Sequence, residues 1–202
     1  MMITLTFTVD AGGPFAVGTG QPSGGLDDTV RSQTPLPASE IKGAMRAAAC
    51  VLLDVNRGAA GPGGVLNAIF GAEGSSGAWA WTDAGPEDCF LIEKRSRTRL
   101  SQQTGMVTRE SLAATQSAWV AAGKQPTFAI EQLAHLDDGH IKEHVALLVA
   151  AAHAVTAVGS WRNRGMGAVS FRPADWNEVQ QVGAARDTIV AIVAGLANAG
   201  AK

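Results

Sequence analysis

A lysine and an arginine stand four residues apart in the stretch LPASEIKGAMRAAACVLL, residues 36–53, whose apolar residues recur at helical spacing. Lys42 and Arg46 therefore share one face of a predicted helix. We expect Ser39 to cap that helix, because a serine oxygen can accept a hydrogen bond from a first-turn amide. Two cations beside a helix N-terminus suit a phosphate group. The alternative is an ordinary solvated basic face.

Arginines cluster at two later places in the chain. In the run KRSRTR, Arg95, Arg97 and Arg99 would project from one side of a strand and could contact a phosphate backbone. The alternative is a charged edge strand that prevents aggregation. Further on, Arg162 and Arg164 stand in the glycine-flanked segment GSWRNRGMG. Glycines permit close approach and exposed amides, so this segment resembles a phosphate cradle.

Two further features carry side chains that can bind metals or transfer protons. Asp27 and Asp28 stand in a long glycine-rich loop, which predicts either a functional loop or a simple Asx turn. The segment HIKEH has the H-x-x-E-H pattern, in which His140 and His144 could bind zinc near Glu143. No third ligand can be placed, so we favour solvated histidines at a helix start, with a zinc hydrolase as a remote alternative.

The composition sets limits on the class of protein. The chain has 202 residues, enough for one sizeable domain, and sixteen basic against eighteen acidic residues give a net charge of -2. Any RNA contact must therefore come from a local basic patch. The two cysteines, Cys50 and Cys89, suit reduced thiols in a core better than a disulfide scaffold. No long apolar run follows a basic N-terminus, so we expect a soluble cytoplasmic protein.

Hydrophobic periodicity predicts alternating strands and helices. Trp79 and Trp81 fall on one face of a strand and are expected in the core rather than as base-stacking platforms, whereas Trp161 fits either role. Residues 101–124 form a polar excursion with modest helical character, and residues 177–198 form one helix that covers the sheet. The other predicted elements are strands at 3–9, 78–82, 89–93 and 127–133, a helix at 137–159, and a strand ending at 171. This order fits a ferredoxin-like α+β sandwich.

Four segments together resemble the RAMP superfamily of CRISPR proteins, particularly the repeated backbone subunit of type III effector complexes. They occur in the family's order between residues 24 and 169 and are GLDDTVRSQTPLPASEIKGAMR, IFGAEGSSGAWAWTDA, RSRTRLSQQTG and GSWRNRGMGAV. The first looks like an acidic loop followed by a P-x-S-x-x-K-G-x-x-R helix entry, and the last looks like a glycine-rich R-G-x-G loop. Ser101 and Gln102 depart from the family, which usually has an Asp-Arg pair there.

The resemblance implies one domain, residues 1–202, with an RNA-recognition-motif-like palm and a thumb inserted at about 94–126. It implies subunits stacked along a CRISPR guide RNA that pairs with a single-stranded target RNA, together with other effector subunits. The residues that would hold RNA are Ser39, Lys42, Arg46, Arg97, Arg99, Arg162 and Arg164.

The resemblance also implies endoribonuclease activity. Asp27 matches the aspartate that the family uses for metal-dependent cleavage of target RNA, with Asp28 as the alternative one position away. The cofactor would be Mg²⁺ or another divalent cation. We expect Asp27 to lie in a flexible loop that contributes little to the fold. A binding-only or capping subunit and a nonenzymatic scaffold remain alternatives.

Overall fold

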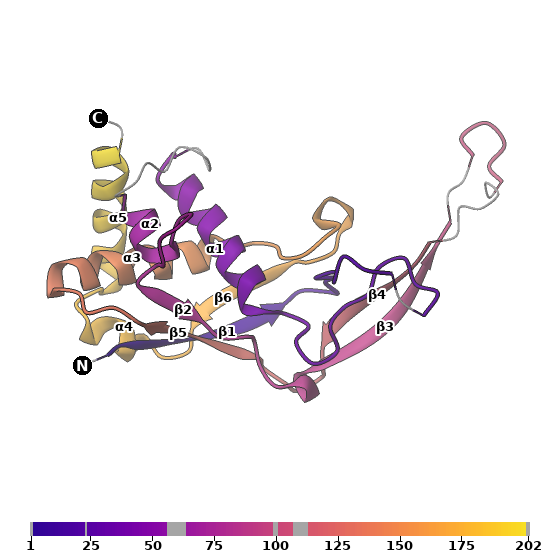
Figure 1. Ribbon diagram of the computed structural model, residues 1–202, viewed down its shortest axis with the longest axis horizontal. Helices are drawn as coiled ribbons and strands as arrows, with labels where there is room; N and C mark the ends of the chain where they lie inside the picture. The colour runs from indigo at the N-terminus through magenta and orange to yellow at the C-terminus, as the bar shows by residue number, and fades with distance from the viewer. Residues whose placement is uncertain (1, 23, 56–63, 99–100, 107–112, 201–202) are drawn as a thin grey trace.

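The main sheet is antiparallel throughout and has the strand order β2-β5-β1-β6. The computed structural model describes residues 2–22, 24–55, 64–98, 101–106 and 113–200. The four strands and the two helices that pack on them follow one another in the order β-α-β-β-α-β (Figure 1). In chain order these elements are β1 (Thr4–Ala11), α1 (Ala38–Leu52), β2 (Trp79–Trp81), β5 (Thr127–Gln132), α3 (Asp138–Ala154) and β6 (Val169–Pro173). Two interleaved split βαβ units give the ferredoxin-like topology, so the predicted α+β class is confirmed.

The core lies between one face of this sheet and the helices. In β1, Leu5, Phe7 and Val9 are buried, whereas the threonines between them are partly or fully exposed, as the alternation of a half-covered strand requires. The rings of Phe7 and Phe128 stack with centroids 5.3 Å apart. α1 and α3 lie on the same side of the sheet (Figure 1) and pack against each other. α1 and α3 are therefore held in place by packing against the sheet and against each other.

The residues predicted to belong to the core are buried. Trp79 and Trp81 lie in β2 with relative exposures of 1% and 9%, which confirms their assignment to the core. Cys50 and Cys89 are free thiols and are both buried, as predicted. Among the described residues, no helix is both long enough and apolar enough to cross a membrane.

A two-stranded ribbon is inserted between β2 and β5 and extends away from the helices (Figure 1). It consists of β3 (Phe90–Arg97), which follows a short 3₁₀ turn (Glu87–Cys89), and β4 (Ala113–Val120). The modest helical character predicted for residues 101–124 is wrong at β4. Every residue of β4 pairs with one of β3, from Phe90 opposite Val120 to Arg97 opposite Ala113. This pairing overrides a weak local preference.

The glycine-rich loop after β1 is attached to the other edge of β4. Phe15 and Ala118 exchange both backbone hydrogen bonds, at 2.9 and 2.7 Å. Further along, the Gln116 amide donates to the Asp28 carbonyl at 3.1 Å, and the Gln116 side chain accepts from Val30 at 3.0 Å. The loop therefore forms part of the ribbon and is tied to it at several points.

The C-terminal region differs from the predicted single helix over residues 177–198. Two helices, α4 (Trp176–Gln181) and α5 (Arg186–Gly200), are separated by a turn in which Gly183 has a φ of 77°. Asp175 caps α4 by accepting from the Asn177 amide at 2.8 Å. α5 packs against α3, whereas α4 reaches the sheet through Glu178, which accepts from the Thr6 amide of β1 at 3.2 Å. The glycine conformation ends the first helix and redirects the chain.

Candidate nucleic-acid interface

The entry into α1 determines where its basic residues lie. The N-cap is Pro37, with extended φ and ψ of -74° and 154°, so the prediction that Ser39 caps the helix is wrong. Ser39 is instead the second helical residue and is exposed. The first amide of the helix, on Ala38, donates to the carboxylate of Asp83 at 2.7 Å. A residue from beyond β2 thus satisfies one of the orphan amides at the start of the helix.

Ser39, Lys42 and Arg46 line a groove on one side of α1, here called the lysine groove, with a volume of about 640 Å³. Its other walls come from β2 and the turn at residues 71–77, which follows the short helix α2 (Val65–Phe70). The Lys42 ammonium lies 5.1 Å from the centroid of the Trp81 ring. This cation–π contact holds a half-exposed lysine at the groove while the tryptophan stays in the core.

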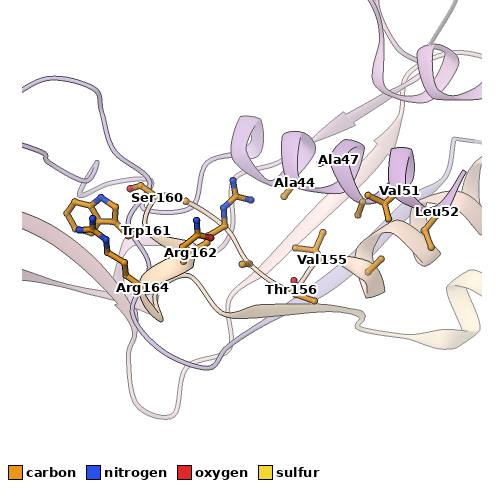
Figure 2. A pocket seen from close by; sticks show the side chains of 15 residues that line it. Ala44, Ala47, Val51, Leu52, Val155, Thr156, Ser160, Trp161, Arg162 and Arg164 are labelled. Carbon is orange, nitrogen blue, oxygen red and sulfur yellow. The ribbon is translucent and has the colours of Figure 1, made fainter. Parts of the chain in front are cut away.

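Arg162 and Arg164 lie in a different groove, on the other side of α1. This arginine groove has a volume of about 730 Å³ and runs between α1 and residues 154–164. Its helical wall consists of small or apolar side chains that include Ala44, Ala47 and Val51 (Figure 2). Both arginines are exposed, and neither forms an ion pair within the described part of the chain. The predicted RNA contacts therefore form two separate sets with α1 between them.

The turn that carries these arginines is fixed by two close backbone contacts. A Cβ on Gly159 would lie 2.4 Å from the Ala16 carbonyl oxygen, and one on Gly167 would lie 2.1 Å from the Val158 oxygen. The two glycines also have positive φ angles, of 74° and 81°. Ser160 donates to the Ala16 oxygen from its amide at 2.8 Å and from its hydroxyl at 2.9 Å. Gly159 and Gly167 thus allow dense packing of the turn, whereas a Cβ on Gly165 would meet no atom within 4 Å.

Glu40 connects this turn to α1, which the sequence did not indicate. Its carboxylate accepts a hydrogen bond from the Gly159 amide at 2.7 Å. Glu40 also lines a third groove, of about 560 Å³, together with Asp27, Asp28 and Ser160. This third groove is called the aspartate groove below. Gly159 and Ser160 line both the aspartate groove and the arginine groove, so the two adjoin at these residues.

Asp27 is exposed in the aspartate groove but does not lie in a free loop. Its carboxylate accepts from the Ala114 amide at 2.8 Å, and its own amide donates to the Ala114 oxygen at 2.7 Å. Asp27 was expected to lie in a flexible loop and to contribute little to the fold, whereas these two hydrogen bonds tie it to β4. Asp28 is half-buried, and its carboxylate packs against Gly18, where a Cβ would come within 2.5 Å of Oδ1. Asp27 is the more accessible of the two.

The aspartate groove offers few protein ligands to a divalent cation. Within the residues that the structure describes, no group of three or more His, Cys, Asp or Glu side chains could hold a metal ion. Mg²⁺, however, commonly uses one or two protein carboxylates together with phosphate oxygens and water. Asp27, being exposed, fits that coordination only when an RNA phosphate is also present.

The HIKEH segment does not form the zinc site that was kept as a remote alternative. His144 is buried, and its Nδ1 accepts a hydrogen bond from the Trp79 indole at 3.0 Å. Burial lowers the pKa of His144 to about 4, so the ring is neutral at pH 7. His140 is exposed, and its ring pairs with Asp137 at 2.5 Å, which raises the pKa of His140. The pKa of Asp137 is lowered, first by the hydrogen bond from the His140 amide and then by the His140 ring. Both His140 and His144 were predicted to be solvated. The prediction is confirmed for His140 and wrong for His144.

Of the three arginines predicted to project from one side of β3, namely Arg95, Arg97 and Arg99, the structure describes only the side chain of Arg95. Arg95 is half-buried, and its guanidinium lies 5.9 Å from the Trp119 ring centroid. The side chain of Arg97 and all of Arg99 lie outside the described residues. Their proposed RNA contacts stay a prediction.

The fold and the grooves define a ferredoxin-like α+β protein with basic residues on both sides of its first helix. The family model described as the RAMP superfamily matches residues 8–170, so the chain belongs to the RAMP superfamily. Among solved structures, a chain of the cryo-EM structure of type III-B Cmr-beta in the apo state is similar, with a TM-score of 0.61 at 10% identity. The match covers 86% of this chain and 98% of that chain, and at this identity it shows the fold. No curated protein matches the chain in sequence.

Proposed function

We propose that this RAMP protein is an RNA-binding backbone subunit of a type III-like CRISPR effector complex, and that it cleaves guide-paired target RNA with a divalent cation. Membership of the superfamily supports the effector role, as does the likeness to a chain of type III-B Cmr-beta. Its partners would be the CRISPR guide RNA, the target RNA, copies of itself and other effector subunits.

One observation supports this function most directly. The aspartate groove, with its accessible Asp27, adjoins the arginine groove at Gly159 and Ser160. A single RNA strand that contacts Arg162 or Arg164 by its phosphates would thus pass close to a carboxylate. Basic residues that hold a strand beside an acidic group are what a metal-dependent ribonuclease needs.

The chain's own part in the reaction is to position the strand. Cleavage without an external nucleophile needs the ribose 2'-hydroxyl in line with its own phosphate, so a bent strand is required. The arginines would hold phosphates on one side of the bend. A divalent cation bound through Asp27 would stabilise the charge on the scissile phosphate.

RNA binding is tested by titration of single-stranded RNA at several salt concentrations. Lys42→Ala and Arg164→Ala should each weaken binding with little dependence on sequence, and each should reduce the salt slope by about 0.7. Arg172→Ala is the matched control, because Arg172 is exposed on β6 and lines none of the three grooves. Unchanged affinity and slope in both groove variants would refute the proposed surface.

Cleavage is tested with an assembled guide and target in Mg²⁺. Asp27→Asn should abolish or greatly slow cleavage and leave guide binding intact, because asparagine still accepts from the Ala114 amide but carries no charge. Asp28→Asn is the matched control and should cleave. If only the Asp28 variant fails, the reactive carboxylate is one position later; if both variants cleave like the parent, neither is catalytic.

A binding-only or capping subunit is the second candidate. The hydrogen bond from Ala114 gives the Asp27 carboxylate a structural role that does not need a metal. In that case the parent protein binds guide RNA and never cleaves an assembled target.

A further inference from the structure

Trp161 has a backbone conformation that a bulky residue rarely adopts. Its φ and ψ are 62° and 25°, in the left-handed region. Such a conformation persists in a large side chain only where surrounding contacts enforce it, and it is concentrated at binding and catalytic sites. The left-handed backbone of Trp161 therefore suggests that its side chain has a binding role in addition to packing.

Contacts on both sides of Trp161 enforce this conformation. Before it, Ser160 is bonded to the Ala16 carbonyl, and Gly159 is bonded to Glu40. After it, the 3₁₀ turn Arg162–Arg164 begins, and the Arg164 amide donates to the Trp161 carbonyl at 2.8 Å. The turn thus holds the backbone of Trp161, Arg162 and Arg164 in a fixed position relative to α1.

The indole ring is half-exposed and lines the arginine groove. In Figure 2, Trp161 and Arg164 are at the end of the groove away from Val51 and Leu52, and the Arg162 side chain points toward α1. The groove therefore combines an aromatic surface, two exposed cations and a wall of small apolar side chains. Phosphate is attracted by the cations, and a planar base can stack on the ring.

We propose that Trp161 is a base-stacking residue, on which one unpaired base of the bound RNA lies while Arg162 or Arg164 holds a neighbouring phosphate. The proposal rests on the proposed function in one respect only, namely that single-stranded RNA is the ligand. It adds a subsite for a base to what would otherwise be a surface for the RNA backbone alone. Because every base has a π face, the subsite tolerates any sequence.

A packing role for Trp161 makes a different prediction. The ring also touches the edge of the hydrophobic core, so removing it could alter the turn without any stacked base. A displaced turn would move Arg162 and Arg164 and change the number of phosphate contacts. A lost stacking contact leaves the phosphate contacts, and hence the salt slope, unchanged.

The experiment measures binding of a short oligouridylate and of an abasic ribose-phosphate oligomer of equal length. The variants are Trp161→Gly, which removes the ring and readily adopts a positive φ, and Trp161→Phe, which keeps an aromatic face. For oligouridylate, Trp161→Gly should bind roughly 5- to 150-fold more weakly than the parent, with an unchanged salt slope, and Trp161→Phe should recover much of the loss. For the abasic oligomer, all three proteins should bind equally.

Several results would overturn the stacking role of Trp161. An equal loss on both oligomers, or a lower salt slope, shows that Trp161 only supports the turn and overturns the proposal. Unchanged binding of oligouridylate by Trp161→Gly overturns it as well. If Trp161→Gly does not fold, Trp161→Leu replaces it, and a loss on the abasic oligomer equal to that on oligouridylate again overturns the proposal. Failure of the parent to bind either oligomer refutes the proposed RNA-binding function instead.

Discussion

The buried His144 makes stability sensitive to mild acid. Its ring accepts from Trp79 in the neutral form and has a pKa of about 4, whereas an exposed histidine in the unfolded chain titrates near 6.5. The unfolded state therefore binds more protons below pH 6.5. It follows that the neutral ring favours folding above that pH, and that this contribution is lost as the pH falls toward about 4.

We predict that the free energy of unfolding drops by roughly 2–3 kcal/mol between pH 7 and pH 4 through this residue. His144→Gln should show a smaller drop, because glutamine can accept from Trp79 and does not titrate. Urea denaturation of both proteins across this range measures the difference. Parallel curves would mean that another group controls acid stability.

The sequence was enough to predict the burial of some side chains, but not the hydrogen-bond partners of others. The alternation Trp79-Ala80-Trp81 was enough to assign two core residues, because burial follows directly from strand period. The cap on α1 could not be predicted, since Asp83 is distant in sequence and only the fold brings it to Ala38. For the same reason Glu40 was missed: its partner, Gly159, comes much later in the chain.

At the scale of elements, three segments meet at one point beside the grooves. The start of α1, the loop after β1 and the turn before β6 are joined by Glu40, Ala16 and Gly159. This arrangement couples the position of Arg162 and Arg164 to the position of α1. A change at Glu40 should therefore affect RNA binding from a distance.

We predict that Glu40→Ala lowers stability by about 1–2 kcal/mol and reduces the salt slope for RNA, because the freed turn no longer fixes its arginines. Glu40→Gln should behave like the parent in both respects, since its amide oxygen can still accept from Gly159. Thermal melts and salt titrations measure the two effects. A Glu40→Gln variant that binds RNA normally but does not cleave would instead make Glu40 a metal ligand.

Elements with strong periodicity were predicted, whereas elements defined by pairing or by a single turn were not. α1 and β1 have regular apolar patterns and appear near their predicted bounds. β4 is rich in Ala, Thr, Gln and Ser, and becomes a strand through pairing with β3 and with the loop after β1. The break between α4 and α5 depends on the left-handed conformation of Gly183, which a helical pattern does not reveal.

On the scale of the whole molecule, the ribbon extends from one end and the two termini lie at the other (Figure 1). α1, whose residues line the lysine groove and the arginine groove, lies between these ends (Figure 1). The predicted organisation, one domain of residues 1–202 with an inserted thumb at about 94–126, stays a prediction, for which the ribbon is the candidate thumb. A chain of this size offers only a short path for RNA.

We predict that copies of the protein assemble along RNA, because longer strands offer more equivalent paths. Native mass spectrometry with RNAs of increasing length should show steps of one subunit. Arg164→Ala should assemble less completely at equal concentration, and Arg172→Ala should match the parent. A single copy on long RNA would contradict self-assembly and favour the capping subunit.

The place of β1 in the sheet has a consequence for synthesis of the chain. β1 is synthesised well before both of its partner strands, because Leu5 pairs opposite Ile130 and Phe7 opposite Pro173. The central strand thus has no partner until its neighbours have emerged, and its apolar side chains stay exposed during translation. Such long-range pairing is slow and leaves a nascent chain open to aggregation. The yield of folded protein should therefore depend on whether β1 is protected from aggregation until β5 and β6 have been synthesised.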